Sequence, residues 1–228
     1  MERFNDLLSR AKSAQLHLRL VVYIVGLFVA AFGVVLSVNS ALGVSPVNSF
    51  PFIVSQIIGL SMGTCVAIVY TVLILIQYLI LRKNFRMINF LQLLASSLFG
   101  YFVDLSRLLL GGFHPVTYAG QLSMQLVGTV LISFGIATFM IAKLINMPTE
   151  GVCTAVSHRW GVPFHRAKIT MDSSFAIMSL MLSLVFLGGV YGIREGTFIS
   201  AILIGKLIPH ARKVIIPTLN RMGIHTPE

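Results

Sequence analysis

Six long apolar stretches alternate with short polar segments along the chain. They cover residues 20–40, 63–81, 88–110, 121–142, 169–190 and 197–216. Each is long enough to cross a hydrocarbon core about 30 Å thick as a helix that rises about 1.5 Å per residue. The pattern therefore predicts an all-α polytopic membrane protein, with six transmembrane helices in a single membrane domain over residues 1–228.

The two halves of the chain repeat the same landmarks. At an offset of 102 residues and without gaps, Gly33 aligns with Gly135, Leu42 with Leu144, Pro46 with Pro148, and Gly59 with Gly161. After a three-residue slip, Gly100 aligns with Gly205. This predicts an internal repeat, with one copy at about residues 20–112 and the other at about 121–216. A basic segment precedes the first stretch, as in a signal peptide, but the equivalent stretch deep in the chain favours a retained span.

A short segment follows the first span of each half. Pro46 and Pro148 suit the first turn of a helix, where the missing N–H would have no partner. Pro51 offers an alternative start for the first of these helices, one turn later. Extended connectors of four or five residues precede the two prolines and can reach about halfway into the membrane. The segments are therefore predicted to be re-entrant half-helices.

The number of spans in each half sets the orientation of the second half. Because each half has three spans, an odd number, the second half crosses the membrane in the opposite direction to the first, as in the inverted repeats of many transporters. The fold predicted from the sequence is thus two inverted three-helix repeats, each with a re-entrant half-helix after its first span. The two half-helices then enter the membrane from opposite faces.

Composition and charge agree with a membrane location. The chain is 56% hydrophobic, only 11% charged, and carries a net charge of +10, whereas soluble domains are about 25% charged. The basic residues fall in the segments on one side of the predicted membrane, and the loops on the other side hold only Arg194. By the positive-inside rule, both termini are predicted to be cytoplasmic in the cell membrane, and nucleic acid is not an expected partner.

The two half-helix N-termini are the candidate binding site. Their free N–H groups and positive dipole ends suit an anionic or polar ligand near the membrane midplane. The candidate substrate-binding residues are Ser45, Pro46, Asn48, Pro148, Thr149, Glu150 and Lys206. Helix capping alone is an alternative role for Ser45 and Glu150, and snorkelling to the headgroups is one for Lys206. We expect Glu150 and Lys206 to form a charge pair across the central cavity.

The remaining polar residues predict little further chemistry. Asp104 and Arg107 are three apart on one span, and Lys168 and Asp172 are four apart on another, so each spacing predicts an ion pair on one helix face. The histidines lack the companions of a metal site, and no motif of an enzyme active site is present. We therefore expect no metal, no cofactor and no enzymatic activity.

Short motifs recur in the two halves: Ala41, Leu42, Gly43, Ser45 and Pro46 in the first, Pro148 and Glu150 in the second, and the segments 100–104 and 196–205 that close the halves. In these residues the chain resembles the bacterial YczE/YyaS/YitT-like membrane proteins. The resemblance covers nearly the whole chain. It implies a membrane fold and location, while the activity of that family is mostly unassigned.

Two classes of function fit these observations. The first is a carrier or channel that moves a small polar or anionic solute through a central site between the half-helix N-termini. The alternative is a non-transporting membrane scaffold or regulator of a biosynthetic or signalling partner. The lipid bilayer and a small-molecule solute are the expected partners of the first class, and the sequence leaves a homodimer open.

Overall fold

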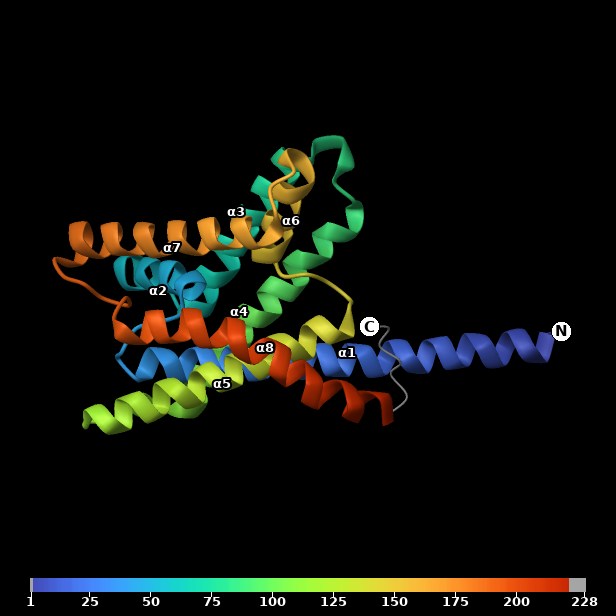
Figure 1. Ribbon diagram of the computed structural model, residues 1–228, viewed down its shortest axis with the longest axis horizontal. Coiled ribbons are helices and arrows are strands. Elements are labelled where there is room, and N and C mark those ends of the chain that lie inside the picture. The colour runs from blue at the N-terminus through green and yellow to red at the C-terminus, as the bar shows by residue number, and fades with distance from the viewer. Residues whose placement is uncertain (1, 222–228) are drawn as a thin grey trace.

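All regular secondary structure in the described part of the chain is helical. The computed structural model describes the backbone of residues 2–221 and the side chains of residues 16–220. Its helices are α1 (Glu2–Asn39), α2 (Pro46–Ile58), α3 (Met62–Leu81), η1 (Arg82–Asn84), η2 (Met87–Phe90), α4 (Leu91–Leu110), α5 (Tyr118–Ala142), α6 (Pro148–Trp160), α7 (Phe164–Leu187) and α8 (Glu195–Arg221). Residues 2–221 contain no strand (Figure 1). The prediction of an all-α protein is confirmed.

Five helices are long and apolar enough to cross a membrane. They are residues 16–39 of α1, residues 62–84 of α3 and η1, residues 87–110 of η2 and α4, α5, and α7. The sixth predicted span is also a helix, α8, but Lys206, Arg212 and Lys213 interrupt its apolar residues. The fold is therefore that of a multi-pass membrane protein, with five clear spans where the sequence predicts six.

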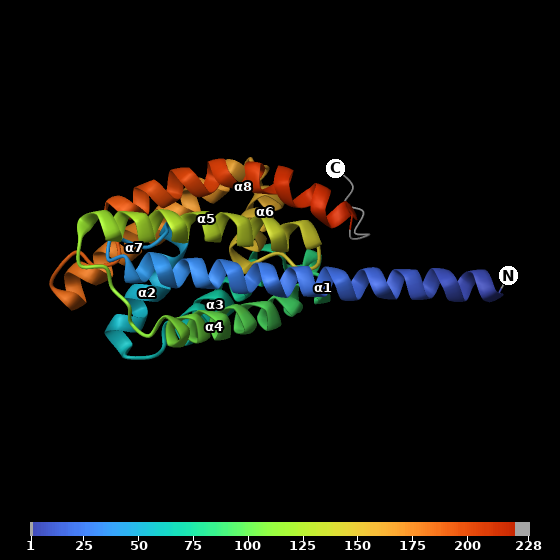
Figure 2. The ribbon, with the colours of Figure 1, turned by 90° about the horizontal axis from the view of Figure 1, so that it is seen from below.

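The helices form two layers (Figures 1 and 2). In one layer, α1 and α5 lie antiparallel with α8 packed against α5, and α4 crosses from α1 to pack beside α3 of the other layer. In the other layer, the short helices α2 and α6 each contact both α3 and α7. We call the end of the bundle where α8 finishes the terminal end, and the opposite end the distal end. Helix α2 lies toward the distal end and α6 toward the terminal end (Figure 1).

Glycines allow α1 and α5 to approach closely. A Cβ on Gly26 would lie 2.9 Å from the Gly135 carbonyl oxygen, and one on Gly33 would lie 2.7 Å from that of Gly128. Small residues permit such backbone approach between membrane helices. At the offset of 102 residues, Gly26 aligns with Gly128 and Gly33 with Gly135. Replacing each glycine by its equivalent in the other half therefore converts the Gly26–Gly135 contact into the Gly128–Gly33 contact.

The short helices α2 and α6 are matched in length and in both ends. Each has 13 residues and begins with its proline. Each ends before a left-handed glycine, Gly59 with φ of 71° and Gly161 with φ of 67°. Glycine adopts this conformation without steric cost, which is why it commonly ends helices. The predicted starts at Pro46 and Pro148 are confirmed, and the alternative start at Pro51 is wrong because this residue lies inside α2.

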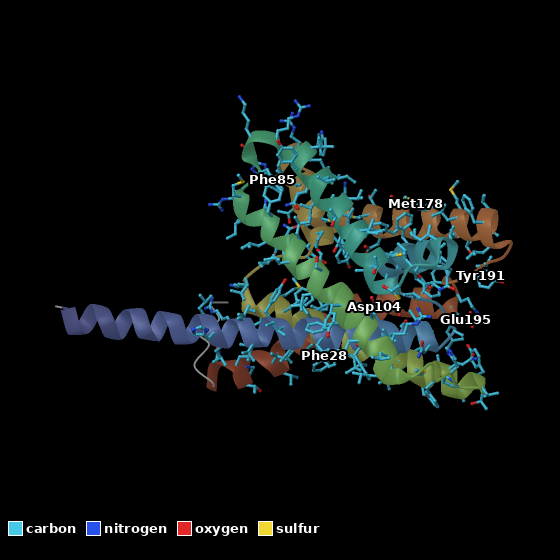
Figure 3. All side chains as sticks on the ribbon, turned by 180° about the vertical axis from the view of Figure 1, so that it is seen from behind. Phe28, Phe85, Asp104, Met178, Tyr191 and Glu195 are labelled. Atoms are coloured by element: carbon cyan, nitrogen blue, oxygen red, sulfur yellow. The ribbon has the colours of Figure 1, made fainter. Side chains whose placement is uncertain are left out.

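Helices α3 and α4 pack together through a second glycine contact and a carboxylate. A Cβ on Gly100 would overlap the Gly63 carbonyl oxygen. Asp104 of α4 accepts hydrogen bonds from Ser61 Oγ at 2.6 Å and from Gly63 N at 2.8 Å, at the start of α3 (Figure 3). Among the described residues Asp104 makes no ion pair with Arg107, so that prediction is wrong. The carboxylate instead complements the positive end of the neighbouring helix.

Helices α7 and α8 lack such a contact. Gly205 aligns with Gly100, but a Cβ on Gly205 would meet nothing within 4 Å. Much of α7 is exposed, including Met178, which is 45% exposed and labelled in Figure 3. The two halves therefore differ most in how their last two long helices pack.

Candidate functional site

Four helices meet at the first turn of α6. This turn holds Thr149, Glu150 and Gly151, and it contacts α3 and α7. Side chains from α3, α4 and α7 reach it through Gln77, Gln92, Lys168 and Asp172. We call these seven residues the α6 site. It lies in the half of the bundle toward the terminal end (Figure 1).

One lysine and two carboxylates provide the charges of the α6 site. Lys168 Nζ lies 3.0 Å from Asp172 Oδ1 and 4.0 Å from Glu150 Oε1. Thr149 Oγ1 also donates a hydrogen bond to Glu150 Oε2 at 2.9 Å. The three charged side chains are between 23% and 31% exposed. The Lys168–Asp172 pair predicted from the spacing of four residues is confirmed.

The predicted pair of Glu150 with Lys206 is wrong. Glu150 lies beside Lys168 of α7, whereas Lys206 is exposed on α8 and makes no ion pair among the described side chains. Helix α6 packs against α3 and α7. The sequence pattern identified an unusual carboxylate but not the helix that supplies its partner.

Two buried glutamines point at the same turn. Gln77 is 4% exposed and Gln92 is 3% exposed. A Cβ on Gly151 would lie 2.6 Å from Gln77 Oε1 and 3.1 Å from Gln92 Oε1, so both amide oxygens converge on this residue. Neither oxygen accepts a hydrogen bond from any group in the described part of the chain. Leaving a buried acceptor unpaired costs about 1–3 kcal/mol, which marks this place as one that a ligand or water completes.

A cavity of about 210 Å³ opens beside the α6 site. It is lined by Phe139, Met140, Lys143, Ile145, Asn146, Met147, Glu150, Thr154 and Phe164. These residues come from the end of α5, the connector 143–147, α6 and the start of α7. Since a water occupies about 30 Å³ of liquid, the cavity has room for a small solute next to the Glu150 carboxylate.

The first turn of α2 forms a separate polar cluster. Asn48 Nδ2 donates to Ser45 Oγ at 2.9 Å, and Ser49 Oγ lies 2.9 Å from Ser179 Oγ of α7. Ser45 forms no side-chain cap on α2, so the capping alternative does not describe it. The structure thus groups Ser45, Pro46 and Asn48 at one helix start and Pro148, Thr149 and Glu150 at the other. It leaves Lys206 with neither group.

The two clusters correspond in the repeat but differ in hydrogen bonding. Ser49 aligns with Gly151 and Ser179 with Gln77, so the Ser49–Ser179 contact is the counterpart of the Gly151–Gln77 contact. The hydroxyls at α2 bond to each other, whereas the Gln77 oxygen at α6 has no partner in the described chain. Asn48 Oδ1 at α2 is likewise buried without a partner in the described chain, so both helix starts hold an unpaired acceptor. The α6 site differs because two such oxygens converge on one residue, Gly151.

Hydrogen bonds hold the connector before α2 against the loop between α7 and α8. Val44 N donates to Gly192 O at 2.8 Å, and Gly196 N donates to Leu42 O at 2.8 Å. The buried Gln125 side chain joins α1, α5 and α8 by bonding Ser37, Ser40, Gly196 and Ser200. Paired polar groups thus hold the connector before α2 in place, while the connector 143–147 at the terminal end borders the cavity.

The sequence-based site omitted both glutamines of the α6 site. The signal was available, because a polar side chain within an apolar span is costly and often functional. The part of the chain that the structure describes contains no group of three His, Cys, Asp or Glu residues able to hold a metal ion. The site is built instead from amides, carboxylates and one ammonium group.

These helices and their polar interior define a multi-pass membrane protein. The chain belongs to the family described as "Family of unknown function (DUF6198)", which matches residues 17–213. It is 28% identical to "Uncharacterized membrane protein YczE" of Bacillus subtilis (strain 168), over 90% of this chain and 91% of that protein. It is 24% identical to "Uncharacterized protein YyaS" of the same organism, over 87% of this chain and 92% of that protein. No solved structure matches the chain. The resemblance to the YczE and YyaS proteins is confirmed.

Proposed function

We propose that this protein transports a small polar solute through the α6 site and releases it chemically unchanged. One observation carries the proposal. Two buried amide oxygens without partners converge on the first turn of a short helix that borders a cavity. Transporters place their solute sites at such interrupted helices, where backbone and side-chain polar groups are free to bind. Unpaired polar groups in a membrane interior are costly. A bound solute supplies the hydrogen-bond partners that these groups lack.

The proposed fold is two inverted three-helix repeats with re-entrant helices α2 and α6. The reciprocal contacts support it, since Gly26–Gly135 exchanges with Gly33–Gly128, and Tyr23–Phe139 exchanges with Ser37–Gln125. Exchange of contacts between antiparallel helices is the property of a two-fold axis perpendicular to them, which lies in the membrane plane. The 13 residues of α2 and of α6 extend about 20 Å at 1.5 Å each, too short to cross.

In this proposal α8 is the sixth span and the terminal end faces the cytoplasm. Helix α8 packs on α5 as α4 packs on α1, which are equivalent positions in the repeat. Arg212 and Lys213 lie in its second half, which ends at the terminal end, and Lys206 lies close to its middle. Basic residues favour the cytoplasmic side. Both termini are then cytoplasmic in the cell membrane.

The difference between the two ends supports alternating access. The distal connector is hydrogen-bonded to Gly192 and to Gly196 at the start of α8, whereas the connector 143–147 borders the cavity. This corresponds to an inward-open carrier. In an inverted repeat, exchanging the conformations of the two halves produces the outward-open state. In the outward-open state the connector 143–147 closes over the cavity. The hydrogen bonds from Val44 N to Gly192 O and from Gly196 N to Leu42 O then break.

An uptake screen tests the proposed function. Proteoliposomes that contain the purified protein are incubated with a defined mixture of polar metabolites, and the retained solutes are identified by mass spectrometry. We expect at least one solute to accumulate only when the protein is present. Gln77→Leu should reduce its uptake at least tenfold, since a lost buried hydrogen bond of about 1.5 kcal/mol is roughly a factor of ten.

The matched control is Gln56→Leu, which makes the same change at an exposed glutamine of α2. It should retain the uptake of the wild-type protein. If no solute accumulates with the wild-type protein, the transport proposal fails and the scaffold function predicted as an alternative takes its place.

A further inference from the structure

We infer that the solute bound at the α6 site carries a protonated amine. The inference rests on the proposed function, because it names the chemical class of the solute for the same site. Three features support it: the balance of charge, the type of unpaired atom, and the state of the helix end. Each is independent of how the solute crosses the membrane.

The charge balance of the α6 site is negative. Glu150 and Asp172 supply two carboxylates, and Lys168 supplies one ammonium group between them. The side chains are mostly shielded from water, so their interaction with a further charge is stronger than at an open surface. Lys143 also lines the cavity beside Glu150, so the excess negative charge belongs to the seven residues of the α6 site and not to the cavity as a whole. Within the α6 site, a cation is therefore favoured over an anion.

The unpaired atoms of the two glutamines are hydrogen-bond acceptors. Gln77 Oε1 and Gln92 Oε1 both approach Gly151 and have no donor among the described groups. An ammonium group has three N–H donors and no acceptor. Its three donors are enough in number for both amide oxygens and one carboxylate. A quaternary ammonium ion has the same charge but no N–H donor, so it can satisfy neither oxygen.

The positive end of α6 is already complemented by its own side chain. Glu150 is the acidic residue of the first turn, and Thr149 Oγ1 donates to it. A carboxylate at this position stabilises the helix dipole. The Glu150 carboxylate therefore takes the place at which the helix N-terminus alone predicts a bound anion. What the site lacks is a donor, and a protonated amine supplies one.

Thermal unfolding of the purified full-length protein tests the inference without a transport assay. The probes are methylammonium and ethanolamine chloride, with tetramethylammonium chloride, sodium chloride and sodium phosphate as controls at equal ionic strength. The two amines should raise Tm by about 3 °C or more, in a manner that saturates with concentration. The three control salts should leave Tm within 1 °C of its value without the amines.

Variants locate the binding. Gln77→Leu should remove the amine-dependent shift, and Gln56→Leu should keep it. A shift with phosphate, an equal shift with tetramethylammonium, or a full amine shift in Gln77→Leu would overturn the inference. Uptake of solutes that lack an amine would overturn it too, while leaving the transport proposal intact. Amine binding without uptake of any solute would support the ligand class and reject transport.

Discussion

Replacing Lys168 by methionine is expected to lower the free energy of unfolding by about 2–4 kcal/mol. The change leaves Glu150 and Asp172 without the cation that lies 4.0 Å and 3.0 Å from them. Removing one partner of a buried ion pair typically costs about 3–5 kcal/mol. The expected loss is smaller because the three side chains are between 23% and 31% exposed. Thermal and denaturant unfolding in a fixed detergent measure it.

Removing the stranded charges should restore much of this stability. The triple variant Lys168→Met, Glu150→Gln and Asp172→Asn should unfold at a higher temperature than Lys168→Met alone, since no uncompensated charge remains. Lys206→Met is the control, because Lys206 is exposed and makes no ion pair within the described region; its effect should stay within about 0.5 kcal/mol. Strictly additive effects of the three changes would show that the residues do not act as one cluster.

The second large effect is expected at Gly100. In Gly100→Ala the new methyl group would overlap the Gly63 carbonyl oxygen, so α3 and α4 must move apart. Overpacking of this kind costs about 1–3 kcal/mol. In Gly205→Ala, at the aligned position in the second half, the methyl group meets nothing within 4 Å. This change should be neutral or stabilise by up to about 1 kcal/mol, because alanine is the better helix former.

The comparison of Gly100→Ala with Gly205→Ala also tests how the halves differ. Measured side by side, the unfolding temperature of Gly100→Ala should fall, and that of Gly205→Ala should stay at or above the wild-type value. If Gly205→Ala destabilises the protein as much as Gly100→Ala does, then another helix covers Gly205 in the membrane. That helix would be α7 in a second conformation or a helix of a second copy. Equal losses would therefore contradict the open α7–α8 packing.

The sequence predicted the helices and their ends because those signals are local. Proline at the start and glycine after the end of α2 and α6 act through the chemistry of a single residue. The apolar stretches predicted every long helix for the same reason. Helix α8 forms as predicted, but it is not among the five clear membrane spans because Lys206, Arg212 and Lys213 interrupt its apolar residues.

The partners of the polar residues could not be predicted in this way. Their apolar surroundings predict a pair between Glu150 and Lys206, but helix packing places Lys168 beside Glu150. The spacing on one helix predicts a pair between Asp104 and Arg107, but Asp104 binds the start of α3. The role of Gln77 and Gln92 depends on three helices meeting at Gly151. Such contacts are set by tertiary packing and leave no periodic pattern.

The inverted repeat requires α2 and α6 to enter the membrane from opposite faces. Single cysteines at the exposed positions Leu60, Val116, Asn84 and Pro163 test it with a membrane-impermeant maleimide on intact cells. The native Cys65 and Cys153 are buried and should not react. We predict labelling of Leu60→Cys and Val116→Cys from outside, and labelling of Asn84→Cys and Pro163→Cys only after the cells are opened. Labelling of Leu60→Cys and Pro163→Cys from the same side would contradict the inverted repeat and the transport proposal built on it.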